Sequence, residues 1–235
     1  MSIRTLASKT LGRIGESFPN TLGHRAELLR QLYVEQKEAE LVGIDQVLDR
    51  LNVQRDLAVD VGANYGAWTF TLARSFSRVL AVEPNVTLAR NLRRLVPRHC
   101  SVAECGVSAV AGYGALYVPK VSGRPLTGWA SFDPKNCPEA DGVTTIPVVI
   151  ETLDRLLADL WPNFIKIDVE GHEYESLLGS RRVLEQVRPV FMIEVKDKSR
   201  CDVVALMREF RYEAKELREL SERDGHPDNM FFCPI

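Results

Sequence analysis

Short apolar runs alternate with longer segments in which apolar residues recur every three or four positions. Short runs are typical of buried strands, and the longer spacing is typical of amphipathic helices. The pattern predicts strands over 57–61, 78–82, 101–107, 145–149, 163–171 and 188–195, with a closing strand within 228–235. It predicts helices over 24–51, 67–75, 86–96, 152–160, 173–184 and 201–210.

Strands that alternate with helices predict an α/β fold, in which helices cover both faces of a mostly parallel sheet. We expect residues 1–52 to form an N-terminal helical extension and residues 53–235 to form one domain. An irregular stretch over 108–143 is rich in Gly and Pro and too long for a plain connection. It is either functional or a surface insertion, and we expect short strands in it near 115–118 and 129–132.

Composition is ordinary for a soluble globular chain of 235 residues, with 45% apolar and 26% charged residues. A net charge of −2 gives no reason to expect a nucleic-acid partner. No apolar run is long enough to predict a membrane span. Five cysteines form no CxxC pair, which indicates reduced thiols in the cytoplasm rather than disulfides or a zinc site.

A glycine-containing turn follows the first predicted strand and precedes a helix. Its residues are Asp60, Gly62, Ala63, Asn64, Tyr65 and Gly66. Ligands of open parallel sheets bind beyond the carboxyl ends of the strands, and glycine lets the backbone approach them closely. A dinucleotide turn wants G-x-G-x-x-G, but Asn64 stands where the middle glycine belongs. Asp60 would repel a pyrophosphate and attract the cationic groups of S-adenosylmethionine.

The second predicted strand ends at Glu83 in "AVEPN". An acid at this place can accept both hydroxyls of a ribose, in a dinucleotide or in S-adenosylmethionine alike. The alternative is structural: Asp60 caps the following helix, and Glu83 is a solvated strand end. The glycines and the strand–helix–strand order favour a nucleoside site.

A second polar cluster lies in "KIDVEGHE". Strand alternation places Lys166, Asp168 and Glu170 on one face, and His172 follows. His172 has the most suitable pKa for a general base. A divalent ion held by Asp168 and Glu170, with Glu194, is an alternative, as is a structural role. We assign no metal ligand, because three acids without a fixed spacing are weak evidence for a metal site. Positioning alone can supply much of the rate of an in-line displacement, so a base need not be indispensable.

The stretches "VDVGANYG", "VLAVEPN", "VVIETLD", "FIKIDVEGHEYESLLG" and "RPVFMIEV" stand in the order seen in the FkbM family of S-adenosylmethionine-dependent, class I methyltransferases. The chain resembles that family over about residues 57–195. The resemblance implies a Rossmann-like sheet of seven strands, the last one antiparallel. It also implies O-methylation as the usual activity, with a small-molecule or glycan acceptor.

Carried over by position, the resemblance implies that the glycine turn holds the methionine end of the cofactor and Glu83 the ribose. Pro84 and Asn85 would lie beside the adenosine, and Glu104 and Gly106 near the adenine. Asp168 would lie beside the cofactor, and the stretch from residue 108 would contact the acceptor. N-methylation, NAD-dependent oxidoreduction and ligand binding without turnover remain rival functions. The N-terminal extension would cover the cleft as a lid or pair two chains as a homodimer; we hypothesise a lid.

Overall fold

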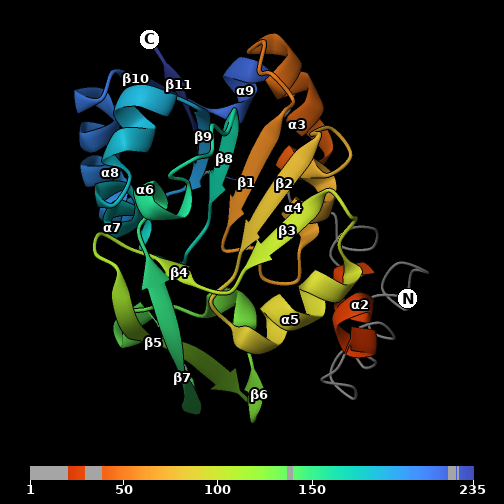
Figure 1. The fold of residues 1–235 in the computed structure, drawn as a ribbon. Helices are drawn as coiled ribbons and strands as arrows, with labels where there is room; N and C mark the ends of the chain where they lie inside the picture. The colour runs from red at the N-terminus through yellow and green to blue at the C-terminus, as the bar shows by residue number, and fades with distance from the viewer. Residues whose placement is uncertain (1–20, 30–38, 137–139, 222–225, 227) are drawn as a thin grey trace.

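A computed structural model describes residues 21–29, 39–136, 140–221, 226 and 228–235. The predicted helix over 24–51 appears as α2 (Thr21–Leu29) and α3 (Ala39–Arg50), and residues 30–38 lie outside the described part. Figure 1 shows a central sheet with helices on both sides and a smaller sheet beyond the carboxyl ends of its parallel strands. The described residues include no helix that is long and apolar enough to cross a membrane.

Within the described residues the main sheet has seven strands in the order β10-β11-β9-β8-β1-β2-β3. Their bounds are β1 (Leu57–Val61), β2 (Arg78–Val82), β3 (Cys100–Ala103), β8 (Phe164–Ile167), β9 (Val190–Glu194), β10 (Tyr212–Lys215) and β11 (Asn229–Pro234). β11 runs antiparallel to both neighbours, and the other described pairs of this sheet are parallel. The predicted antiparallel last strand is therefore confirmed, and the strand order reverses beside β1.

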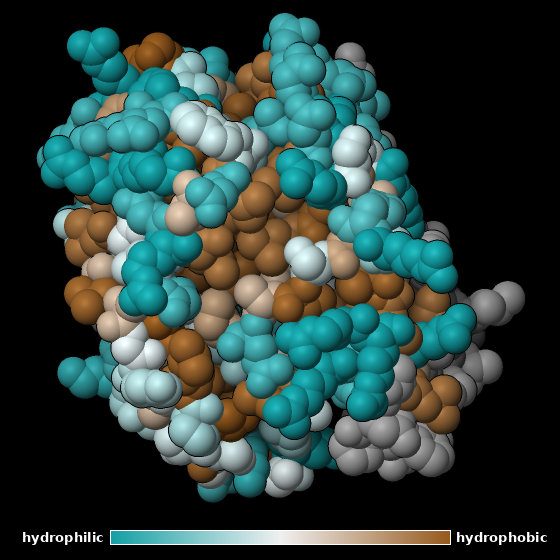
Figure 2. Space-filling view, viewed as in Figure 1, coloured by the Kyte–Doolittle hydropathy of each residue, from teal (hydrophilic) through white to brown (hydrophobic). Residues whose placement is uncertain are grey.

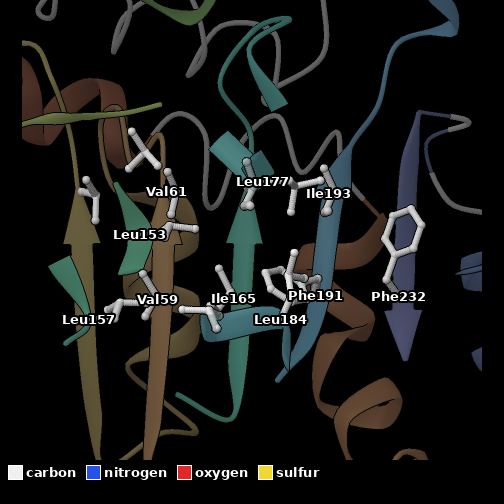
Figure 3. Close-up of a cluster of buried hydrophobic side chains, with 14 of the residues drawn as sticks. Val59, Val61, Leu153, Leu157, Ile165, Leu177, Leu184, Phe191, Ile193 and Phe232 are labelled. Carbon is white, nitrogen blue, oxygen red and sulfur yellow. The ribbon is translucent and has the colours of Figure 1, made fainter. Parts of the chain in front are cut away.

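Two hydrophobic cores form because successive strand residues point to opposite faces. On one face Val59, Ile165 and Phe191 meet Leu153 and Leu177 (Figure 3). That face is covered by α6 (Leu153–Leu156), α7 (Glu173–Leu178), a π-helical turn (Val183–Val187) and α8 (Asp197–Glu209). The opposite face carries α3, α4 (Ala67–Leu72), α5 (Val86–Leu95) and α9 (Leu217–Leu220).

α3 is part of the second core. Ile44, Val47 and Leu48 are buried in one cluster with Ala58 of β1 and Phe164 of β8. Residues before position 53 therefore contribute to the core of the domain. α2 packs beside α5 instead.

The stretch predicted to be irregular contains a second sheet, which within the described residues has the order β4-β7-β5-β6. Its strands are β4 (Gly106–Val107), β5 (Gly112–Val121), β6 (Arg124–Pro125) and β7 (Gly142–Glu151). The strand predicted at 115–118 lies within β5. The one predicted at 129–132 is wrong: a 3₁₀ turn (Thr127–Trp129) is followed by a single bridge from Ser131 to Tyr117.

The third predicted strand, over 101–107, is also corrected. It divides into β3, which joins the main sheet, and β4, which pairs with β7 of the second sheet. The chain therefore crosses from one sheet to the other between Ala103 and Gly106. Figure 2 shows the molecule from the same side as Figure 1. Apolar side chains gather at the centre of that view, over β1, β2 and β4, with hydrophilic side chains around them.

Candidate active site

The turn between β1 and α4 needs its glycines. Gly62 has φ +83°, and a Cβ there would stand 1.8 Å from the carbonyl oxygen of Asp168. Gly66 has φ +94°, and a Cβ there would stand 2.4 Å from Leu92. Both values lie in the region that side chains disfavour. The backbone of the turn is thus pressed against the exit of β8 on one side and α5 on the other.

Glu83 is held at the end of β2 by that turn. Its Oε1 accepts a hydrogen bond from the Asn85 amide at 2.7 Å, and its Oε2 accepts one from the Asn64 amide at 2.7 Å. Burial raises the pKa of Glu83 to about 7. Each carboxylate oxygen retains a lone pair for another donor, so the predicted bidentate contact with two hydroxyls is geometrically available.

Asn64 places an unsatisfied acceptor in the same region. Its φ is +50°, and its side-chain Oδ1 is buried without a hydrogen-bond partner among the described residues. A buried polar atom without a partner is costly and calls for an explanation such as a ligand. Asn64 lines the cavity described next, so a ligand there could supply the missing donor.

A cavity opens beyond the carboxyl ends of β1, β2 and β8, where the predicted cofactor site should lie. The strand ends supply Gly62, Glu83, Pro84, Asp168 and Glu170. The opposite wall comes from the second sheet and the segment that follows β6, which supply Gly106, Val107, Leu116, Thr127, Gly128, Ala130, Ser131 and Phe132. The predicted loop therefore does contribute to the site.

Asp60 lies away from the cavity wall. It is fully buried, its Oδ2 accepts a hydrogen bond from the Thr69 hydroxyl at 2.6 Å, and its Oδ1 lies 4.0 Å from the Lys166 ammonium. Burial raises the pKa of Asp60, and Lys166 opposes that rise. Asp60 Oδ1 has no hydrogen-bond partner among the described residues, and contact between Asp60 and a ligand stays a prediction.

Asp168 faces the cavity. Its Oδ2 accepts a hydrogen bond from Lys166 Nζ at 2.9 Å. Burial alone would raise the pKa of Asp168, but Lys166 and a hydrogen bond from the Glu194 carboxyl lower it below its ordinary value. The charge of Asp168 and burial raise the pKa of Glu194 to about 9. At neutral pH the pair is thus an ionised Asp168 beside a protonated Glu194.

Glu170 lies at the other side of the cavity mouth, with its side chain paired to Lys196. Burial and the charge of Asp168 raise the pKa of Glu170, and Lys196 opposes them. The carbonyl oxygen of Glu170 accepts hydrogen bonds from Ser131 Oγ at 2.8 Å and Asn136 Nδ2 at 3.2 Å. These bonds fasten the segment after β6 to the exit of β8.

His172 does not line the cavity. Its Nε2 is 2.9 Å from Ser108 Oγ, and its ring meets the edge of Phe132 with centroids 5.1 Å apart. Burial lowers the pKa of His172. The predicted base, His172, therefore lies behind Phe132, which lines the cavity, and supports the Phe132 ring.

Other predicted residues also lie behind or beside the cavity. Ala63 is buried near Leu92 of α5, and Asn85 caps α5 by accepting the amides of Thr87 and Leu88. Glu104 forms ion pairs with two arginines of α5 rather than turning inward.

The carbonyl of Tyr65 is 2.9 Å from His24 Nε2, so α2 contacts the turn between β1 and α4. Trp129 is half exposed beside the cavity, while its neighbours Gly128 and Ala130 line it.

The structure bears on the alternative of a divalent ion held by Asp168 and Glu170, with Glu194. The carboxyls of Asp168 and Glu170 are occupied by lysine ammonium groups. Among the described residues, Glu194, His226 and Asp228 bring ligand atoms within 4.8 Å of one another.

The four described cysteines are free thiols, as predicted, and Cys137 lies outside the described residues.

From the sequence, Lys166 was named only for its strand face and was given no role, and Phe132 was not named. Lys166 interrupts the apolar strand "FIKI" and is only 3% exposed, and a buried lysine is rare unless paired. That interruption was the signal that could have found it. Phe132 gave no such signal, because its segment reaches the site only through the second sheet.

The reversal of strand order, the antiparallel last strand and the cavity beside β1 define a Rossmann-like α/β domain. Residues 60–221 match the Methyltransferase FkbM domain. The chain therefore belongs to the FkbM methyltransferase family.

Solved structures align with this chain at low sequence identity. One is the methyltransferase FkbM from Methylobacillus flagellatus KT, with a TM-score of 0.53 and 17% identity. The alignment covers 97% of this chain but 58% of that one, so this chain spans less than two thirds of its length. Another is apo CalS11, a TDP-rhamnose 3′-O-methyltransferase, with a TM-score of 0.49, 13% identity, and coverage of 97% and 93%. No match was found among curated proteins.

Proposed function

We propose that the protein uses S-adenosylmethionine to methylate a hydroxyl group of a small molecule or glycan. The observation that carries this proposal is the charge and polarity of the cavity. Glu83, Asp168 and the orphan Oδ1 of Asn64 all offer acceptors to it. Such a wall suits two ribose hydroxyls and a cationic methionine end, and it would repel a pyrophosphate.

The residues present fit the cofactor. Glu83 would accept the two ribose hydroxyls, and Asn64 Oδ1 together with Asp168 would face the methionine amino group. Gly62 and Gly106 also line the cavity, and only glycine fits there, because a Cβ would collide with the Asp168 carbonyl or with the Phe132 ring. When bound, S-adenosylmethionine supplies an electrophilic methyl group on a sulfonium.

The chain's own contribution is to orient the acceptor and take its proton. As the acceptor hydroxyl received that methyl group, it would lose its proton, which a carboxylate of the chain would accept. Glu170 is better suited than Asp168, because its pKa is raised while that of Asp168 is lowered. His172 would act by supporting Phe132.

The cofactor is tested by calorimetric titration with S-adenosylhomocysteine and, separately, NAD. We expect S-adenosylhomocysteine to bind and NAD not to bind. Glu83→Gln should weaken S-adenosylhomocysteine binding by about 10-fold or more, because a hydrogen bond to a charged group contributes about 1.5–3 kcal/mol. Asp202→Asn, an exposed acid on α8, is the matched control and should bind as wild type does. Binding of NAD, or of neither ligand, would contradict the proposal.

The acceptor is tested with S-adenosylmethionine that carries a ¹³C-methyl group. The enzyme is incubated with hydroxylated small molecules, glycans and matched amines, and the products are assigned by NMR. We expect the label on oxygen, and Glu170→Gln should slow its transfer without weakening S-adenosylhomocysteine binding. Label found on nitrogen only would replace O-methylation by N-methylation and leave the cofactor assignment intact.

A further inference from the structure

Lys166 of β8 is a buried cation between two acids. It is 3% exposed, and its Nζ is 2.9 Å from Asp168 Oδ2 and 4.0 Å from Asp60 Oδ1. Asp60 and Lys166 are register partners on the adjacent strands β1 and β8, so their side chains share one face of the sheet. The Trp68 ring lies 5.6 Å from the ammonium on the α4 side.

Burying an ammonium costs free energy unless carboxylates compensate it. A methionine or leucine would fill the same space in the strand without that cost. The lysine must therefore contribute something that an apolar residue could not. The geometry indicates that this contribution concerns Asp168. Lys166 contacts two acids, and Asp168 is the one of them that lines the cavity.

We propose that Lys166 is a positioning residue that holds the Asp168 carboxylate as an anion directed at the cavity, and that Asp60 acts by fixing Lys166 from the opposite side. Asp60 thus contributes to cofactor binding through Lys166 and not by contact. This inference rests on the proposed function, since it concerns how the same cavity receives the methionine end of the cofactor.

The charged groups around these three residues are mostly acids. Glu83 faces them from β2, Glu194 from β9, and Glu170 and Glu173 from the chain after β8; Lys196, after β9, is the cation among them. Without Lys166, Asp60 and Asp168 face each other with no ammonium between them. Like charges in a buried site raise the pKa, so at least one of the two acids would take up a proton.

Proton counting tests this proposal. Lys166→Met is titrated with S-adenosylhomocysteine between pH 6 and 8, in buffers of different ionisation enthalpy. We expect binding to be at least about 10-fold weaker than wild type at pH 6 and to recover as the pH rises. We also expect the variant to release more protons on binding than wild type does, because the ligand's ammonium group favours the ionised carboxylate.

Lys215→Met is the matched control. Lys215 also pairs with a carboxylate two residues away, that of Glu213, but on β10 at the far edge of the sheet. It should leave the affinity and the proton count at wild-type values. If Lys166→Met also shows wild-type affinity and proton count, with only a lower melting temperature, Lys166 is structural and the proposal is wrong.

A double-mutant cycle tests the part assigned to Asp60. Asp60→Asn should weaken S-adenosylhomocysteine binding in the wild-type background, whereas in Lys166→Met it should not weaken binding further and should partly restore it, because the repulsion between Asp60 and Asp168 is removed. Equal effects in both backgrounds would show direct contact and overturn the relay.

If Lys166→Met does not fold, two other variants decide. Lys166→Arg should keep the wild-type proton count, and Asp168→Asn should weaken binding more than Asp60→Asn does. The opposite results would overturn the proposal. Failure of the proposed function is distinct, because wild type itself would then not bind S-adenosylhomocysteine.

Discussion

Four acids at the carboxyl ends of the strands differ in protonation because their surroundings differ. Lys166 keeps Asp168 ionised, the charge of Asp168 keeps Glu194 protonated, and Glu83 titrates near neutrality. Glu170 has a raised pKa beside Lys196. One edge of the sheet therefore holds proton donors and proton acceptors side by side, which is a suitable arrangement for moving a hydroxyl proton.

Glu194 gives a prediction for stability. Its folded pKa of about 9 lies above its unfolded value near 4.5, so its contribution is fully present below pH 4.5 and is lost as pH rises through 9. We expect the melting temperature of wild type to fall from pH 7 to 9.5. Glu194→Gln keeps a hydrogen-bond donor for Asp168 but cannot ionise, so its melting temperature should fall less. Equal falls would show that Glu194 is ionised in the folded protein.

Glu83 gives a prediction for affinity. Its pKa of about 7 means that a large part of the protein carries a neutral Glu83 at pH 6, which accepts hydroxyl donors poorly. The dissociation constant of S-adenosylhomocysteine should decrease from pH 6 to 8 in wild type. In Glu83→Gln this part of the pH dependence should disappear. Calorimetry at the two pH values measures both.

At the scale of single elements, the β1–α4 turn is constrained by its neighbours. Gly62→Ala should destabilise by more than the roughly 1–2 kcal/mol of a left-handed residue, because the new methyl group also collides with the Asp168 carbonyl. Gly112→Ala is the control: its methyl group would meet nothing within 4 Å. That variant should be neutral or slightly more stable. Urea unfolding of both variants compares them, and similar losses would contradict this account.

Elements were predicted well where one local signal sufficed. β1, β2 and α5 follow from apolar periodicity, whereas the Asn85 cap of α5 was found only in the structure. Parts of β5 and β7 were predicted, at 115–118 and 145–149, but their full length and their pairing were missed because Gly and Pro interrupt the alternation. Gly114 is needed there for a tertiary reason, since a Cβ would stand 2.5 Å from Ile150 of β7. The predicted helix over 173–184 breaks at Gly179, which lies against the Ser108 carbonyl.

The site was predicted in the same uneven way. Gly62, Glu83, Gly106 and Asp168 line the cavity because each stands at a strand end, which the sequence pattern locates. Asp60 faces Lys166 instead, because strand register decides what lies beside a side chain. Register depends on pairing between distant segments, and a single sequence does not reveal it.

At the scale of the whole molecule, α2 lies against the turn between β1 and α4. His24 is buried, and its Nε2 contacts the Tyr65 carbonyl. We expect deletion of residues 1–29 to raise the dissociation constant of S-adenosylhomocysteine several-fold, since the turn loses its outer support. The domain core should remain folded, because Ile44 and Leu48 of α3 are retained. Unchanged affinity would contradict the lid hypothesis.

The crossing between the two sheets has a consequence for how enzymes of this kind diversify. Val107 pairs with Glu151, and the Ser108 amide donates to the Glu151 carbonyl at 3.0 Å. The chain between Ser108 and Glu151 leaves the domain and returns to the same point. An exchange of that excursion would alter the wall opposite Glu83 and Asp168 while both anchor residues stay in place. On the proposed function, we expect an exchange of this segment between members of the family to change acceptor preference and to leave the half that would bind the methyl donor unchanged.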